Sequence, residues 1–154
     1  MRTRLILAIV LMTLCVACIH KQGGPVSPWE RANVNLAALA QVNNDVAKGI
    51  IAAQQAGTIT AQQAAPILNF QEAVAKDHMA LENIFATGAE QAASQSAKIQ
   101  ALLEEIKAQG TALIQSGGLG LKNPRSQQSF TQDLQGIVNL AEVALADYQR
   151  AEGK

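Results

Sequence analysis

Asp77 and His78 are the residues of this chain whose types and spacing best suit chemistry. They are adjacent, and Asp77 falls on an apolar helical face that also carries Val74 and Leu81. A carboxylate beside an imidazole could bind a ligand or a metal, handle a proton, or form an ion pair across a helical bundle. Because buried carboxylates are rarely unpaired, we favour a fourth interpretation, in which both side chains lie at an interface edge near Lys76.

The spacings of known catalytic and metal-binding motifs are absent around these two residues. Di-iron bundles use Glu-x-x-His pairs on facing helices, and this chain has no Glu-x-x-His. It has no Gly-x-Ser-x-Gly, and the glycine-rich stretch 117–120 lacks the lysine spacing of a phosphate-binding loop. We therefore expect no catalytic residue, no metal and no cofactor. A weaker hypothesis is an enzyme whose site is shared between subunits.

Cys15 and Cys18 form a Cys-x-x-Cys, a spacing that occurs in redox proteins and in haem attachment. Ile19 rather than histidine follows Cys18, and both cysteines lie in or beside an apolar targeting segment. We therefore assign them neither redox nor haem chemistry. Because no cysteine lies beyond Cys18, the domain that follows contains no disulfide.

The first residues have the order of a secretory signal. Arg2 and Arg4 precede an apolar run that begins at Leu5, and small residues come just before Cys18. The apolar run is shorter than the roughly twenty residues that a membrane-spanning helix needs. A polar segment with Gly-Gly-Pro follows it. We therefore expect a cleaved signal peptide over residues 1–17 rather than a retained membrane anchor.

The sequence Cys15-Val16-Ala17-Cys18 resembles the lipobox of bacterial lipoprotein precursors. Val16 and Ala17 match that pattern, while Cys15 stands where leucine is usual. The resemblance implies cleavage before Cys18, a diacylglyceryl group on its sulfur and an acylated new N-terminus. Two or more fatty chains hold a protein stably on a membrane. If the bacterium has two membranes, the residue after the cysteine is informative. Ile19, rather than Asp, at this position resembles lipoproteins that are sent on to the outer membrane. The alternative is ordinary cleavage after Ala17, which would release a soluble protein.

The composition limits the classes of partner. Twelve basic and twelve acidic residues cancel, so no net field attracts nucleic acid. Aromatic residues make up only 3% of the chain, which argues against base-stacking platforms and against a large aromatic ligand cavity. Residues 18–26 are expected to form a flexible tether, and residues 27–154 are one domain long enough to bury a core.

Four amphipathic helical segments are expected in this domain. Ser27 and Glu30 predict a capping box with Pro28 at the first helical position, and Thr60 and Gln63 predict a second box. Apolar residues then recur at helical spacings of three, four and seven. The four faces are Ala32, Leu36, Leu39, Val46, Ile50 and Ala53; Ile67, Phe70, Val74, Leu81 and Ile84; Ala92, Ile99, Leu103, Ile106 and Leu113; and Phe130, Leu134, Ile137, Ala141, Leu145 and Tyr148.

Three positions predict local departures from this pattern. Asn43 falls on the first apolar face; a buried asparagine can fix helix register, but we expect this one at a wetted edge. Pro66 would remove a backbone hydrogen bond and kink or delay the helix, so we expect a bend there rather than a clean start. Thr87 and Glu90 predict a third capping box around Gly88, where the apolar face falls out of phase, so we expect the chain to reverse there. A stutter within one long helix is the alternative.

These segments, joined mainly by short turns, predict an all-α, antiparallel up-down four-helix bundle. We expect a non-enzymatic protein with a structural or protein-interaction role, exported and held on the bacterial cell membrane or outer membrane by a lipid on Cys18. It would face the periplasm or the cell exterior, with a protein partner in the envelope and no nucleic acid. The alternative function is a secreted bundle that binds a small ligand or metal near Asp77 and His78.

Overall fold

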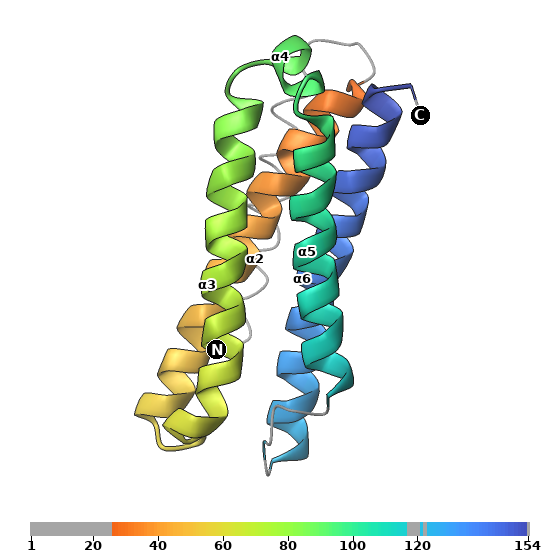
Figure 1. Ribbon diagram of the computed structural model, residues 1–154. Coiled ribbons are helices and arrows are strands. Elements are labelled where there is room, and N and C mark those ends of the chain that lie inside the picture. Colours follow the sequence, from red (N-terminus) through yellow and green to blue (C-terminus); the bar gives the residue numbers. More distant parts are fainter. Residues whose placement is uncertain (1–25, 117–120, 122, 154) are drawn as a thin grey trace.

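The computed structural model describes residues 26–116, 121 and 123–153, and every regular element in these residues is a helix (Figure 1). The expected all-α fold class is therefore confirmed for this part of the chain. The expected signal peptide, Cys18 and the tether up to residue 25 lie outside the described residues. The helices are α2 (Pro28–Gln55), α3 (Ala61–Phe85), α4 (Ala89–Ala93), α5 (Ser96–Gln115) and α6 (Pro124–Ala151).

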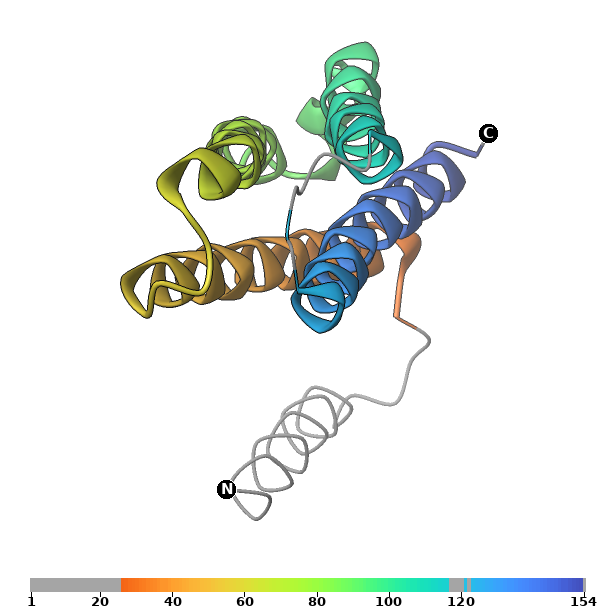
Figure 2. The same cartoon turned by 90° about the horizontal axis from the view of Figure 1, so that it is seen from below.

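The four long helices pack around a shared core (Figures 1 and 2). Helix α2 contacts α3 and α6, and α5 also contacts α3 and α6, so each long helix has two long neighbours. The four predicted apolar faces are confirmed as the source of the core, apart from three partly buried residues near helix ends. Those three residues are Ala53, Leu113 and Phe130.

Two of the predicted capping boxes are confirmed. The Ser27 hydroxyl accepts from the Glu30 amide at 3.1 Å, and the Ser27 amide donates to the Glu30 carboxylate at 2.8 Å. These hydrogen bonds, the one from the Ser27 backbone above all, hold the pKa of Glu30 below its ordinary value. Thr60 and Gln63 form the same reciprocal pair at 3.2 and 2.9 Å. Local sequence therefore fixes where α2 and α3 begin.

The break at Gly88 is confirmed, but the third capping box is wrong. Helix α3 ends at Phe85, and Gly88, with a φ of +90°, is itself the residue that precedes α4. No side chain caps α4, because the Thr87 hydroxyl donates to the Ile84 carbonyl at 2.6 Å instead. A second break follows between α4 and α5, so two helices stand where the sequence predicted one.

Pro66 does not delay the helix that contains it. Helix α3 already begins at Ala61, and Pro66 lies inside its second turn. The capping box of Thr60 and Gln63 satisfies amides at the start of the helix, so α3 tolerates the one backbone hydrogen bond that Pro66 removes. Helix α3 therefore has a clean start, and the expectation that it would not is wrong.

Candidate functional site

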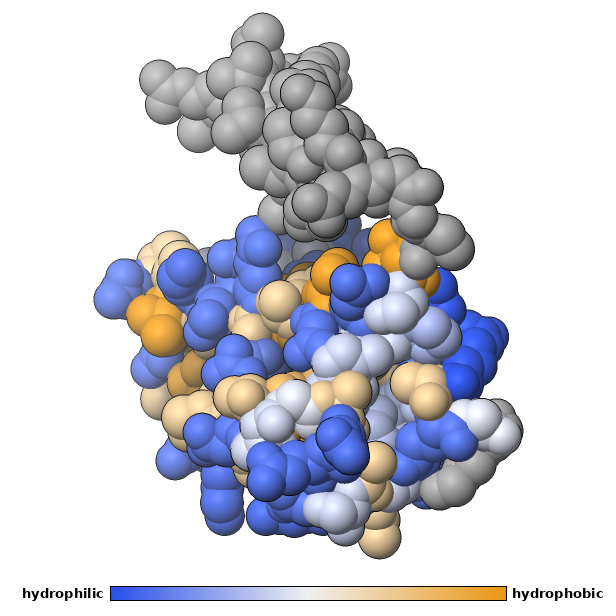
Figure 3. All heavy atoms as spheres, turned by 90° about the horizontal axis from the view of Figure 1, so that it is seen from above, coloured by the Kyte–Doolittle hydropathy of each residue, from blue (hydrophilic) through white to orange (hydrophobic). Residues whose placement is uncertain are grey.

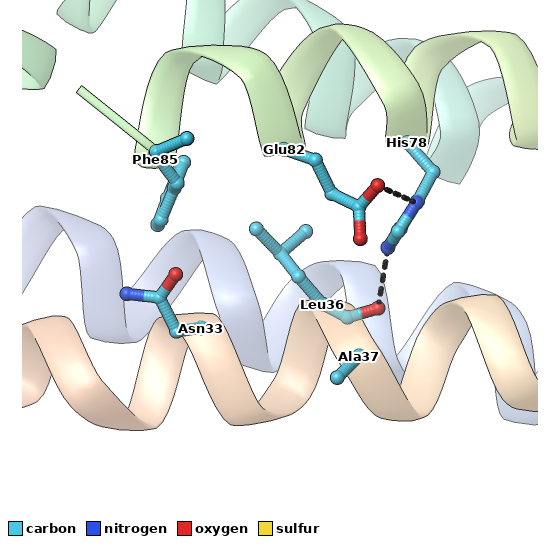
Figure 4. A pocket seen from close by; sticks show the side chains of 7 residues that line it. Asn33, Leu36, Ala37, His78, Glu82 and Phe85 are labelled. Carbon is cyan, nitrogen blue, oxygen red and sulfur yellow. Dashed lines mark hydrogen bonds and ion pairs between the residues drawn. The ribbon is translucent and has the colours of Figure 1, made fainter. Parts of the chain in front are cut away.

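The imidazole of His78 bridges α3 and α2 (Figure 4). Its Nε2 lies 2.9 Å from the carbonyl oxygen of Leu36. Because a carbonyl oxygen only accepts, Nε2 must carry a proton and donate it. On the other side of the ring, Nδ1 lies 3.7 Å from Oε2 of Glu82, one helical turn further along α3. The ring is thereby held to the backbone of α2, and its other nitrogen faces a carboxylate of its own helix.

Two hollows flank His78 at the contact between α2 and α3. The larger, a cleft of about 370 Å³, has polar groups from Asn33, His78 and Glu82 and apolar walls that include Leu36 and Phe85 (Figure 4). The smaller, of about 170 Å³, is also lined by His78, together with side chains that include Asn43, Val74 and Met79. His78 is therefore the residue that the described linings of the two hollows share.

Asp77 does not join this arrangement. Burial raises the pKa of the Asp77 carboxyl, the negative charge of Glu105 on α5 raises it further, and Lys76 lowers it. Within the described residues Asp77 forms no hydrogen bond or ion pair, whereas His78 contacts α2. The two adjacent residues thus interact with different helices. Both are buried, with 8% of Asp77 and 6% of His78 exposed, so the predicted position at an interface edge is wrong.

A buried polar pair lies at the same contact between α2 and α3. Asn43 donates from Nδ2 to the backbone carbonyl of Gln71 at 3.0 Å. Both residues are 4% exposed, so the wetted edge predicted for Asn43 is wrong. Asn43 Oδ1 and both polar atoms of the Gln71 side chain have no hydrogen-bond partner among the described residues. Sequence reasoning missed Gln71, whose one signal is its place a heptad before His78.

Asp147 is a second buried carboxylate, and the sequence did not single it out. It is 3% exposed and accepts from Arg31 Nε at 3.2 Å, Asn35 Nδ2 at 3.1 Å and Arg150 Nη1 at 2.9 Å. Arg31 also donates from Nη1 to the carbonyl of Val26 at 2.7 Å. Three donors and no unsatisfied oxygen mark this network as a structural tie between α2, α6 and Val26.

Three aromatic rings gather near this network. Trp29 stacks on Phe85 with ring centroids 4.4 Å apart, and both rings lie within 6.3 Å of the ring of Tyr148. The Tyr148 hydroxyl donates to Glu152 at 2.7 Å. Burial, and then this hydrogen bond, raise the pKa of Tyr148, while a hydrogen bond with Ser96 lowers it. The cluster closes the end of the bundle at which α2 begins and α6 ends (Figure 1).

The face of the described bundle that is seen from above is mostly polar (Figure 3). Hydrophobic residues on that face form small groups among hydrophilic ones (Figure 3). The exposed large apolar side chains in the described ranges are Val34, Ile51, Met79 and Val143. They come from three different helices, so they do not by themselves define a docking patch.

No protein-family model, no curated protein and no solved structure matches this chain. The fold and the site therefore define the class of protein, which is a helical bundle with a polar contact between α2 and α3. In residues 26–116, 121 and 123–153 no three His, Cys, Asp or Glu side chains gather closely enough to hold a metal ion. No helix in the same residues is both long and apolar enough to cross a membrane.

Proposed function

We propose that this chain is a lipid-anchored helical-bundle protein of the bacterial cell envelope, with a structural or protein-interaction role and no enzymatic activity. Cys18, at the end of a segment with the order of a secretory signal, carries this proposal. Arg31 supports it, because it holds the carbonyl of Val26 and the carboxylate of Asp147 together. A lipid on Cys18 would therefore hold one defined end of the bundle near the membrane.

The long helices are proposed to run up and down in antiparallel order. Contacts between α2 and α3 support this. From one contact to the next, the residue number rises by seven in α2 and falls by seven in α3, as it does between antiparallel helices. The pairs in contact are Trp29 with Phe85, Leu36 with His78, and Asn43 with Gln71.

Two other helix pairs support the same order. Positions early in one helix of each pair meet positions late in the other, as an antiparallel bundle with short connections requires. The pairs in contact or facing each other are Arg31 with Asp147 and Gly49 with Phe130 between α2 and α6, Ser96 with Glu152 at the ends of α5 and α6, and Gly110 with Val138 within them.

The anchor is tested by replacing Cys18. We expect the wild-type protein in the membrane fraction of expressing cells and the Cys18→Ala variant in the soluble fraction, because the variant has no thiol to carry the lipid. Cys15→Ala, which keeps the lipidated residue, is the matched control and should stay with the membrane. Mass spectrometry of the mature N-terminus should find an acylated Cys18. Unchanged partitioning of Cys18→Ala together with an unmodified Cys18 would refute the anchor.

A second function, binding of a small ligand or metal near Asp77 and His78 by a secreted bundle, is favoured by the cleft beside His78. Its test is metal content and thermal stability with added Zn²⁺ or Cu²⁺. A ligand held by the imidazole should raise the melting temperature of the wild type by a few degrees and leave His78→Ala unchanged. An equal response of the two proteins would exclude His78 as a ligand.

A further inference from the structure

We propose that the cleft between α2 and α3 binds an organic ammonium ion, that is, a positively charged amine that carries an apolar arm. This proposal refines the second proposed function, the binding of a small ligand or metal near Asp77 and His78. It rests on that function, because both use the cleft beside His78. It does not depend on the lipid anchor.

The first argument is the pairing of two acceptors at the cleft. Nε2 of His78 donates to the Leu36 carbonyl, so in the uncharged form of the ring Nδ1 has a lone pair and no proton. That lone pair faces Oε2 of Glu82, another acceptor, at 3.7 Å. Two acceptors gain nothing from each other, but an N–H group placed against both would be held by two hydrogen bonds, one of them charge-assisted.

The third polar residue of the cleft also presents an acceptor. Asn33 uses its Nδ2 to donate to the carbonyl of Trp29 at 3.0 Å, which leaves Oδ1 as its remaining polar atom. Among the described residues, no lysine or arginine lines the cleft. The acceptors of the described lining are a carboxylate, an imidazole lone pair and an amide oxygen, beside the second N–H of the Asn33 amide. An ammonium group, which has up to three donors and no acceptor, complements this set in both charge and hydrogen bonding.

The apolar lining specifies the rest of the ligand. Leu36 and Phe85, with Ala37 and Ala86, form the walls next to the acceptors (Figure 4). The cleft, at about 370 Å³, lies within the roughly 300–1,000 Å³ typical of small-molecule sites. A bare metal ion would leave these walls unused, and the described residues supply no third metal ligand beside His78 and Glu82. An amine with an aromatic or branched apolar arm uses both parts of the cleft.

The test is an NMR titration of the full-length protein in a non-ionic detergent. The imidazole nitrogens are recorded at slightly alkaline pH, where a free imidazole is neutral, and assigned with a His78→Gln variant. Titration with 2-phenylethylammonium should shift the His78 Nδ1 signal in a saturable way, because the ammonium donates to that atom. The uncharged analogue 2-phenylethanol should give no such shift.

Two matched variants separate charge in the cleft from charge elsewhere on α3. Glu82→Gln should weaken 2-phenylethylammonium binding by about tenfold or more, the scale of one lost charge-assisted hydrogen bond. Glu72→Gln removes the same charge from an exposed position of the same helix and should bind as the wild type does. Thermal melts of both variants check that they are folded.

Several results would overturn the proposal. These are a Nδ1 that is already protonated without ligand, no saturable shift, an equal shift with 2-phenylethanol, or unchanged affinity in Glu82→Gln. If the ammonium fails while Zn²⁺ stabilises the wild type and not His78→Ala, the ammonium site is wrong and the second function stands. If neither probe responds, both are wrong.

Discussion

Asp77 and Asp147 are both buried aspartates, and the chemistry around each decides what it does for stability. Asp147 accepts hydrogen bonds from two arginines and an asparagine, so its charge is compensated. Asp77 forms no hydrogen bond or ion pair among the described residues, and burial raises its pKa. A raised folded-state pKa means that the folded protein binds a proton more tightly than the unfolded chain. Asp77 therefore destabilises the fold increasingly as pH rises from its ordinary pKa through the raised one.

Replacing Asp77 with asparagine should stabilise the protein at neutral pH. We expect Asp77→Asn to raise the free energy of unfolding by roughly 1 kcal/mol at pH 7, because a neutral amide loses less hydration on burial than a carboxylate does. The gain should shrink as the pH falls through the raised pKa of the folded carboxyl, and it should be lost by about pH 4, near the ordinary pKa of an unfolded aspartate. Urea denaturation at both pH values measures this. The control is Asp45→Asn, an exposed position. A loss of stability at pH 7 would show that Asp77 has an attractive partner.

His78 shows why residue type alone did not define the site. Its neighbour in sequence is Asp77, but its partners in space are Leu36 and Glu82. Glu82 lies one helical turn away and was within reach of sequence reasoning, since side chains at i and i+4 share a helix face. Leu36 was not, because its role is that of a backbone carbonyl on another helix.

At the scale of the element, small residues set how closely the helices approach. A Cβ at Gly110 of α5 would lie 2.6 Å from Cγ2 of Val138 on α6 and 3.1 Å from Cζ of Phe70 on α3. At Gly136 of α6 the nearest atom, Cγ1 of Val42, is 4.0 Å away. The two glycines therefore differ in what a methyl group would meet, although both lie inside helices.

Alanine substitution should separate these two glycines. Gly110→Ala should lower the free energy of unfolding by about 2 kcal/mol, because the methyl group overpacks a three-helix contact. Gly136→Ala should raise it by about 0.5–1 kcal/mol, the gain in helix propensity. Thermal or urea denaturation of the two variants measures both changes. If Gly110→Ala were as stable as Gly136→Ala, α5 would not approach α6 as closely as described.

The helix starts show how one missing interaction changes an element. Thr60 and Thr87 are each followed three residues later by a Gln or Glu that could complete a capping box. The box forms at Thr60 because α3 begins at the next residue. At the second place the helix begins after Gly88, so Glu90 falls at the second helical position instead of the third and cannot reach back. The sequence pattern alone does not reveal this shift of one residue.

At the scale of the whole molecule, Asp147 joins the start of α2 to the end of α6. Its partner Arg31 lies 116 residues away and also holds Val26, which precedes α2. The aromatic rings of Trp29, Phe85 and Tyr148 pack near the same end of the bundle. This end of the described bundle is therefore fixed by both charge and apolar contacts.

Removing Asp147 should weaken that end of the bundle. We expect Asp147→Ala to lower the free energy of unfolding by about 2 kcal/mol, because three donors lose a buried partner, though the arginines can still reach water. The control is Asp45→Ala, whose ion pair with Lys48 is exposed, and it should change stability by no more than about 0.5 kcal/mol. Urea denaturation compares the two. Equal effects of both substitutions would mean that the Asp147 network contributes no more than a surface pair.

The sequence by itself determined the all-α class, the apolar faces, the starts of α2 and α3 and the break at Gly88. These features depend on periodicity and on hydrogen bonds between residues at most four positions apart, so they are written locally in the chain. The signal-like segment that ends at Cys18 is a local pattern too, and the anchor it implies stays a prediction.

Only the tertiary structure decided which polar residues are buried together. Asn43 meets Gln71 across 28 positions, and His78 meets Leu36 across 42. Such contacts depend on how the helices are rotated about their axes and set side by side, which no local pattern encodes. For the same reason the cleft beside His78 became visible only once α2 and α3 were packed against each other.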